Sequence, residues 1–267
     1  MSSVPVPAAK GTRRRAFLAI LSRDLWVTLR REPGGFLAQA LLQPIFFLFI
    51  FGRVLPEIGQ AQGSYGSLLL PGVMALTAIT VSLQNVALPL VIDFSFTKEI
   101  EDRLLAPLPA WAVGVEKIIH AALRGVFSAF VLLPIAAFVL PDGLQLGNAS
   151  WPALIGVIVG GSLAGGCLGL VMGTAVPANR INIVFAVVLT PLLFTGATFY
   201  PWSALDSLRW FQIVTLLNPL TYVSEGARAA IGTGDHLATW AIPTGIVGSI
   251  LLFGAIGLIG FRRRAVD

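Results

Sequence analysis

The stretch from residue 152 to residue 176 reads PALIGVIVGGSLAGGCLGLVMGTAV and contains no charged residue. A helix that crosses the hydrocarbon core of a bilayer needs about 20 predominantly apolar residues, so this stretch is long enough to span a membrane. Glycines spaced four residues apart let a neighbouring helix approach closely. The stretch therefore predicts a membrane helix packed tightly inside a bundle. Its four Gly-xxx-Gly pairs lie at positions 156/160, 161/165, 165/169 and 169/173.

Five further apolar stretches of the chain are also long enough to span a membrane. Apolar residues make up 56% of the sequence and charged residues 12%, and the mean hydropathy is +0.84, well outside the range of a soluble domain. We expect an all-α, polytopic membrane protein with six transmembrane helices, an N-terminal amphipathic interface helix and a re-entrant outer helix pair before the last span. The predicted spans are 35–56, 66–92, 117–140, 152–176, 181–200 and 240–261, and the predicted domains are a disordered 1–12, an interface helix at 13–34 and a membrane domain at 35–267.

The basic residues predict how the chain is oriented. With six spans both termini lie on one side, and fifteen of the eighteen Lys and Arg residues fall on that side. Loops on the cytoplasmic side of membrane proteins are enriched in Lys and Arg, so we expect both termini in the cytoplasm. The pI near 10 is then explained by contact with anionic lipid headgroups, without nucleic acid. Only Arg53, Arg209 and Arg228 fall on the outer side.

The segment before the first span has the periodicity of an amphipathic helix. Apolar side chains recur at helical spacing and basic side chains lie elsewhere, and Glu32-Pro33-Gly34-Gly35 then ends the helix. We interpret it as a helix on the membrane surface, and it is equally suited to contact a cytoplasmic partner. Its diagnostic residues are Phe17, Leu21, Leu25, Arg23 and Arg30.

The cytoplasmic loop between the second and third spans is highly charged. Thr97 can cap a short helix that Pro107 and Pro109 would end. A charged helix projecting from the bilayer is more than a connection requires, so we interpret it as a docking element, the alternative being a solvated loop. Its residues are Lys98, Glu99, Glu101, Asp102, Arg103, Leu104 and Leu105.

Two short apolar segments precede the last span and are separated by Asn218-Pro219. Each is too short to cross, and irregular backbone at membrane depth persists only where protein or a wet cavity surrounds it. We therefore expect a re-entrant pair that enters from the outer face. Tyr222 lies on its second helix, where Glu225 and Arg228 are spaced to pair across one turn. A structural ion pair is the simpler interpretation, and a role in substrate passage is the alternative.

Amides and aromatic residues inside the spans indicate either helix packing or a substrate route. The aromatic content favours an amphipathic or lipid-like substrate over a small ion, although ordinary lipid-facing aromatics would look the same. The residues that we associate with a route are Gln39, Gln43, Phe47, Gln84, Asn85 and Phe194.

The chain lacks the motifs of several kinds of active site. No Gly-Lys dipeptide occurs, so there is no phosphate-binding loop for ATP, and His-Glu-x-x-His is also missing. The predicted spans carry no mid-membrane carboxylate of the kind that relays protons or sodium ions. We expect no catalytic, cofactor or metal site in this chain. Energy for transport would then come from a partner.

The order of these features resembles the permease subunits of ABC-2 type exporters, most closely the branch that contains daunorubicin-exporter and nodulation-factor-exporter permeases. The likeness extends from about residue 15 to 264, and its most specific parts are 217–228 and 103–108. The resemblance implies that 96–105 couples to a separate nucleotide-binding subunit, which holds ATP and magnesium. The same likeness places the helix at 13–31 against that subunit. Family members often have a glycine where this chain has Asp102-Arg103, which affects the fine geometry of the coupling helix.

The resemblance also implies an outer gate and a dimer. The gate would consist of two helices at about 203–216 and 219–231. A second permease protomer, identical or paralogous, would face this one, with the first, second and fifth spans near the substrate route. The expected location is the inner or plasma membrane of a bacterium. An ion-coupled secondary transporter and an intramembrane lipid-modifying enzyme are the alternatives.

Overall fold

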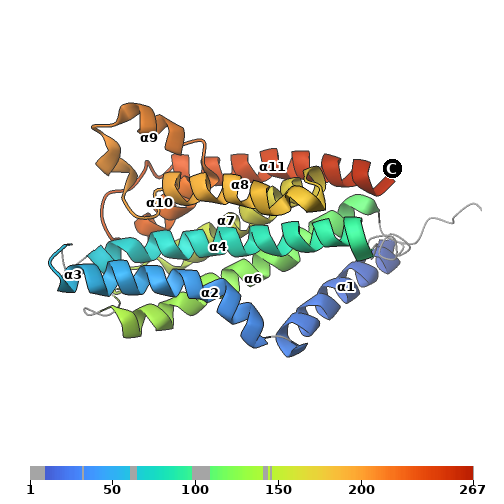
Figure 1. Ribbon diagram of the computed structural model, residues 1–267, viewed down its shortest axis with the longest axis horizontal. Coiled ribbons are helices and arrows are strands. Elements are labelled where there is room, and N and C mark those ends of the chain that lie inside the picture. Colours follow the sequence, from blue (N-terminus) through green and yellow to red (C-terminus); the bar gives the residue numbers. More distant parts are fainter. Residues whose placement is uncertain are drawn as a thin grey trace, which may run out of the picture.

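The computed structural model describes residues 10–31, 33–60, 65–97, 109–140, 144 and 146–266. Within these ranges the chain forms helices and no strand (Figure 1). Six of the helices are long and apolar enough to cross a membrane, which confirms the predicted fold class. The helices are α1 Lys10–Arg31, α2 Pro33–Phe49, α3 Leu55–Glu57, α4 Tyr65–Ile92, α6 Ala110–Val139, α7 Trp151–Ala175, α8 Ile181–Thr195, α9 Arg209–Thr215, α10 Pro219–Ile231 and α11 Ala241–Val266, with π-helical turns η1 Ile50–Val54 and η2 Asp93–Thr97 and 3₁₀ turns η3 Ala178–Arg180 and η4 Trp202–Leu205.

Two of the predicted span boundaries differ from the structure for local reasons. The third span begins at Ala110 and not at 117. Lys117 is paired with Asp93, so its charge can be accommodated inside the helix and does not mark the start of the span. The fifth span ends at Thr195 and not at 200, because Gly196 and Ala197, which has a φ of +50°, turn the chain away. The N-terminal helix begins at Lys10, three residues before its predicted start.

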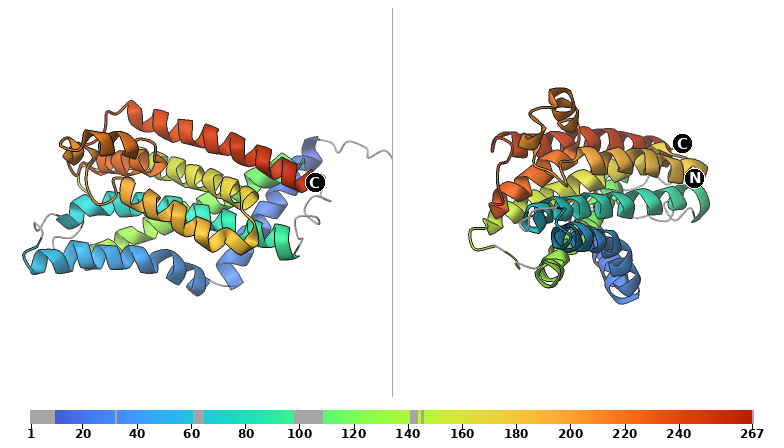
Figure 2. Two further views of the ribbon diagram at one scale, coloured as in Figure 1. Left: turned by 45° about the horizontal axis from the view of Figure 1, so that its top comes forward. Right: turned by 60° about the vertical axis from the view of Figure 1, so that its left-hand side comes forward.

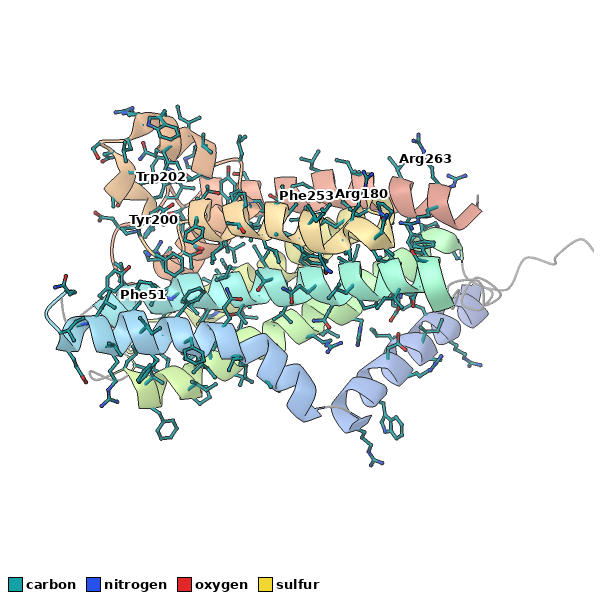
Figure 3. All side chains as sticks on the ribbon, in the orientation of Figure 1. Phe51, Arg180, Tyr200, Trp202, Phe253 and Arg263 are labelled. Atoms are coloured by element: carbon teal, nitrogen blue, oxygen red, sulfur yellow. The ribbon has the colours of Figure 1, made fainter. Side chains whose placement is uncertain are left out.

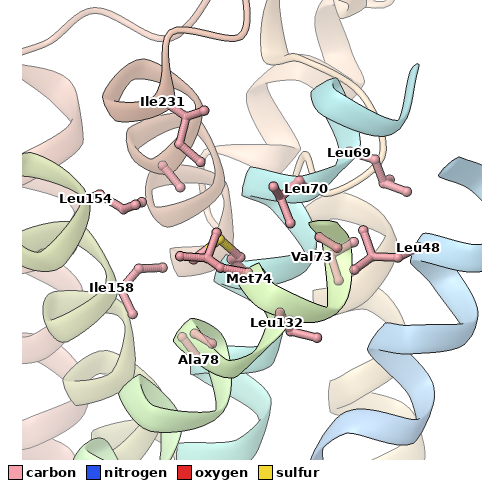
Figure 4. Close-up of a cluster of buried hydrophobic side chains, with 14 of the residues drawn as sticks. Leu48, Leu69, Leu70, Val73, Met74, Ala78, Leu132, Leu154, Ile158 and Ile231 are labelled. Carbon is pink, nitrogen blue, oxygen red and sulfur yellow. The ribbon is translucent and has the colours of Figure 1, made fainter. Parts of the chain in front are cut away.

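Helix α4 occupies the centre of the bundle and is buried along most of its length. One hydrophobic cluster surrounds its first half and takes side chains from five helices (Figure 4). Met74 of α4 is fully buried there, together with Leu48 of α2 and Leu132 of α6. α7 and α10 contribute Ile158 and Ile231. The core is therefore built around α4, and the other helices cover it.

Small residues allow α7 to lie directly against α4. A Cβ atom on Gly165 would lie 2.5 Å from the Ile79 carbonyl oxygen, and one on Gly169 would lie 2.5 Å from the Leu83 carbonyl oxygen. These are contacts between backbones, so they have no room for even a methyl group. The Gly-xxx-Gly pattern of this span thus has the packing role that the sequence predicts.

The bundle has two chemically different ends. The start of α1, η2, the start of α6 and the end of α11 lie at one end, which we call the basic end (Figure 1). α3, α9 and α10 lie at the opposite end, which we call the hairpin end, as the rotated views also show (Figure 2). By the charge rule the basic end corresponds to the predicted cytoplasmic side.

Two π-helical turns extend long helices at their ends. η1 continues α2 toward α3, and η2 continues α4 from Asp93 to Thr97. A π turn places one additional residue in a helical turn and is frequently found at functional positions. Each π turn therefore changes the direction in which the chain leaves its helix, α2 in the case of η1 and α4 in the case of η2.

We predict that the glycines facing α4 are needed for stability. Gly165→Ala would force its methyl group into the backbone of α4 and lower the free energy of unfolding by about 1–3 kcal/mol. Gly156→Ala is the matched control, because a Cβ there meets nothing within 4 Å, and it should leave stability unchanged or raise it by up to about 1 kcal/mol through helix propensity. Thermal unfolding of the purified proteins in detergent measures both. Equal stability of the two variants would contradict the proposed packing.

Candidate functional site

Asn218 joins the end of α8 to the start of α10. Its Oδ1 atom accepts a hydrogen bond from the backbone N–H of Leu220 at 2.9 Å, which caps α10. Its Nδ2 group donates to the Leu192 carbonyl oxygen at 2.8 Å and to Thr195 Oγ1 at 2.9 Å. Pro219 then occupies the first position of the helix, where its missing N–H is not needed. At the predicted break, Asn218-Pro219, helix α10 therefore begins, and the Asn218 side chain hydrogen-bonds this helix start to the end of α8.

Glu225 and Arg228 form an ion pair that is completely buried. Glu225 Oε1 also accepts from the backbone N–H of Trp202 at 3.0 Å, and Oε2 accepts from that of Leu237 at 2.8 Å. Arg228 Nη2 donates to the Ala197 carbonyl oxygen at 3.1 Å. The pair consequently ties two backbone segments to α10, the one from Ala197 to Trp202 and the one at Leu237. The ion pair that the i, i+3 spacing predicts is therefore formed.

The segment before α10 differs from the predicted single helix at 203–216. It consists of the short turn η4 and the two-turn helix α9, separated at Asp206–Leu208. Gln212 Nε2 donates to Asp206 Oδ1 at 2.9 Å and to the Trp202 carbonyl oxygen at 3.3 Å, and Trp202 Nε1 donates to the Gln212 carbonyl oxygen at 3.2 Å. These side-chain bonds fold the segment back on itself, so it cannot extend as one helix. The Tyr222 hydroxyl group of α10 donates a hydrogen bond to the Leu216 carbonyl oxygen at 2.7 Å and so holds the end of α9 against α10.

Four phenylalanines gather near the hairpin end. The ring centroids of Phe47 and Phe51 lie 5.2 and 5.5 Å from that of Phe199, and the centroid of Phe194 lies 6.4 Å from it. Tyr65 donates to the Phe199 carbonyl oxygen at 2.8 Å and holds the central ring in place. Figure 3 shows Phe51 and Tyr200 at this end of the molecule. Two of the predicted route residues, Phe47 and Phe194, thus belong to one aromatic cluster, and sequence reasoning missed the role of Phe199 at its centre.

The predicted amides do not join that cluster. Gln84 and Asn85 lie about 20 residues along α4 from Tyr65, which corresponds to roughly 30 Å of helix. Asn85 Nδ2 donates to the Val81 carbonyl oxygen at 2.7 Å within its own helix. Gln43 is exposed on α2, and the side chain of Gln39 lies outside the described part of the chain.

The N-terminal helix packs obliquely against α6 (Figure 1). Phe17 and Leu21 are half-buried, whereas Leu18, Arg23 and Arg30 are exposed. The Arg30 guanidinium lies 5.1 Å from the centre of the Trp26 ring, a cation–π distance. The side chain of Leu25 lies outside the described part of the chain. So do all of the predicted coupling residues, Lys98, Glu99, Glu101, Asp102, Arg103, Leu104 and Leu105.

A network of side chains at the basic end connects α4, α6, α7 and α11. Lys117 Nζ of α6 donates to Asp93 Oδ2 at 2.8 Å, and both side chains are nearly buried. The next residue, Phe94, packs against Phe261 of α11 with centroids 5.8 Å apart, and the Arg264 guanidinium lies 4.7 Å from its ring centre.

Arg264 also closes the carboxyl end of α7. Its Nη1 group lies within hydrogen-bonding distance of the carbonyl oxygens of Gly173, Thr174 and Val176, at 3.2, 3.1 and 3.3 Å. A cation at a helix carboxyl end is favoured by the helix dipole. In the sequence this arginine is only one of many basic residues near a span end, so its cap role could not be predicted.

No metal-binding cluster occurs among the residues that the structure describes, since no three His, Cys, Asp or Glu side chains there are grouped to hold an ion. The features that stand out are therefore a polar clamp and an aromatic cluster at the hairpin end and a charged network at the basic end.

Comparison with known proteins identifies the class of protein. Residues 15–231 match the ABC-2 type transporter family, so the chain belongs to this family of membrane transport permeases. It is similar to the putative transport permease ycf38 of Cyanophora paradoxa, with 30% identity over 229 residues that cover 79% of this chain and 72% of the relative. It is also similar to the inner membrane transport permease YadH of Escherichia coli K12, with 28% identity over 217 residues covering 76% of this chain and 82% of the relative.

We predict that the buried ion pair holds the hairpin end together. Arg228→Leu would leave the buried carboxyl group of Glu225 without its ionic partner, which should lower the free energy of unfolding by about 3–5 kcal/mol. Arg53→Leu removes the same charge from the exposed Arg53–Glu57 pair and should change stability by less than about 1 kcal/mol. Thermal unfolding in detergent compares the two. Equal effects would show that the clamp contributes no more than a surface pair.

We also predict that Arg264 protects the carboxyl end of α7. In Arg264→Gln the carbonyl groups of Gly173 and Thr174 lose their cationic partner, so amide hydrogen exchange should become faster in residues 172–176. Arg263→Gln removes the same charge from an exposed neighbour and should leave exchange there unchanged. Similar exchange in both variants would contradict the capping role.

Proposed function

We propose that this chain is the transmembrane subunit of an ATP-driven exporter that moves an amphipathic or lipid-like substrate out across the membrane. The observation that carries the proposal is membership of the ABC-2 type transporter family in a chain that has no phosphate-binding loop. ATP and magnesium would then belong to a separate nucleotide-binding subunit, and a protein without its own ATP site needs a surface that receives that subunit's motion.

The charged segment at 98–105 is suited to receive that motion. In the chain it connects η2 with α6, the two elements that carry the Asp93–Lys117 pair, and η2 also carries Phe94, which contacts Arg264. A displacement of this segment would move α4 and α6 directly, because the segment is covalently connected to both, to α4 by way of η2. It would reach α7 and α11 through Phe94 and Arg264. Rigid helices joined at one end can be tilted as a unit, which is the kind of motion that alternating access requires.

The substrate route would lie on the face formed by α2 and α8. These helices present exposed apolar side chains, among them Leu42, Phe46, Ile183, Val187 and Phe194. Exposed apolar surface inside a membrane is available to lipid, to an amphipathic substrate or to a second protomer. We propose that two protomers, identical or paralogous, enclose the route between such faces, with the aromatic cluster around Phe199 at its outer end.

The proposed location is the inner membrane of a bacterium. One relative, YadH, is named an inner membrane transport permease. The distribution of Lys and Arg, fifteen against three, supports cytoplasmic termini, and the basic end would then face the side where ATP is available.

Neutralising the coupling segment tests the proposal. The chain would be reconstituted with its nucleotide-binding subunit in vesicles that contain phosphatidylethanolamine labelled with a fluorophore as an amphipathic probe. In the variant Glu99→Ala, Glu101→Ala, Arg103→Ala we expect ATP hydrolysis to continue while ATP-dependent movement of the probe falls about tenfold, within the usual range of coupling free energies. The control is Arg53→Ala with Glu57→Ala, an exposed pair at the hairpin end, which should transport normally. Normal transport by the triple variant would refute the assignment of the docking segment.

A further inference from the structure

An apolar groove of about 600 Å³ lies between α7, α10 and α11 at the hairpin end. This volume falls in the range of pockets that hold small ligands. Small residues such as Gly226 and Ala229 of α10 form its floor, and Val157 of α7 and Ile246 and Val247 of α11 form its walls. The three helices pack against one another at this end of the bundle (Figure 2). The groove is separate from the α2 and α8 face of the proposed export route.

The groove has one polar end. Ser150, His236 and Thr239 line it where α7 and α11 begin, and the remaining lining is apolar apart from backbone. Trp151 and Trp240 are both exposed at this level. Exposed tryptophans are enriched where a membrane helix meets the headgroup region. The polar mouth is therefore at the depth of lipid headgroups, and the apolar part extends from it toward the middle of the bilayer.

The length of the groove matches one leaflet. On α7 its lining extends from Ser150 to Gly160, which is about 15 Å of helix. The hydrocarbon core of a bilayer is about 30 Å thick, so the groove covers about half of it. Its occupant must be apolar over that distance and polar at one end. A phospholipid with one acyl chain in the groove meets both conditions.

We propose that this groove binds one acyl chain of a phospholipid from the leaflet at the hairpin end, with the headgroup beside His236 and Thr239. Because both walls are membrane-spanning helices, the groove opens sideways to lipid, so a chain can enter from the bilayer. A bound lipid would fill the space between α7 and α11 and support the position of α10. The site would thus be a structural or regulatory lipid site, distinct from the route of the exported substrate.

Gly156 offers a direct way to fill the groove. It lines the groove, and a Cβ built on it meets nothing within 4 Å, so a larger side chain fits the fold but occupies the site. Gly248 of α11 is the matched control, because a Cβ there also meets nothing within 4 Å and Gly248 does not line the groove. Gly156→Leu and Gly248→Leu thus make the same change inside and outside the proposed site.

Photo-crosslinking tests the proposal. The full chain would be placed in vesicles of phosphatidylethanolamine and phosphatidylglycerol that contain a phosphatidylcholine with a diazirine on one acyl chain, and crosslinked peptides would be mapped by mass spectrometry. We expect crosslinks on the groove-lining residues Gly226, Ala229 and Ala230, reduced about tenfold (about 1.4 kcal/mol of binding free energy) in Gly156→Leu and unchanged in Gly248→Leu. Crosslinks on these residues that persist in Gly156→Leu would overturn the proposal. So would the absence of these crosslinks from the original protein.

The position of the diazirine gives a second readout that needs no variant. A diazirine near the headgroup should label residues close to Ser150 and Thr239, and one near the chain end should label residues close to Gly160 and Ile250. Labelling that does not change with the position of the diazirine would contradict an acyl chain lying along the groove. Neither experiment involves ATP or the partner subunit, so failure of the export assignment leaves this result interpretable.

Discussion

The contact between α4 and α7 is the constraint on which the other contacts of the bundle depend. Lipid tails are as apolar as the helices themselves, so helices in a membrane associate through close packing and polar contacts and not through exclusion of water. Gly165 and Gly169 bring the α7 backbone against the carbonyl groups of α4, where dispersion contacts are most numerous. α6, α10 and α2 then pack around the resulting pair. A side chain at either glycine would separate the two helices and move every surface that the others cover.

The polar contacts are concentrated at the two ends of this apolar bundle. Glu225 and Arg228 fasten loops at the hairpin end, whereas Asp93, Lys117 and Arg264 fasten helix ends at the basic end. The middle contains mainly apolar side chains and glycines, whose contacts have little directional preference. In such an arrangement, directional polar contacts determine which helix ends are joined. The angles between the helices are determined by the packing of apolar side chains.

Much of the fold could be predicted from the sequence, because span length and glycine spacing are local properties. All six membrane helices were predicted, and α10 occupies the predicted range 219–231. The break at Asn218 was also predicted, since proline and a capping residue are local signals. The fold of the segment around Trp202 and Gln212 was not predicted, because it depends on side chains that meet only after the chain turns. Arg264 of α11 caps the carboxyl end of α7 by bonding to residues more than 80 positions away in the chain. No local sequence pattern reveals such a contact.

The π-helical turn η2 has a consequence for how the membrane bundle is oriented toward its partner. Successive residues of an α-helix are rotated by about 100°, so one additional residue in a turn rotates everything that follows by that amount. The direction in which the chain leaves α4 at Thr97 is therefore determined by η2 as well as by the axis of α4. A deletion of one residue there would nearly preserve the length and hydrophobicity of the span but rotate the direction of the chain at Thr97 by about 100°. The direction of the chain at Thr97 is therefore set by the register of a single helical turn.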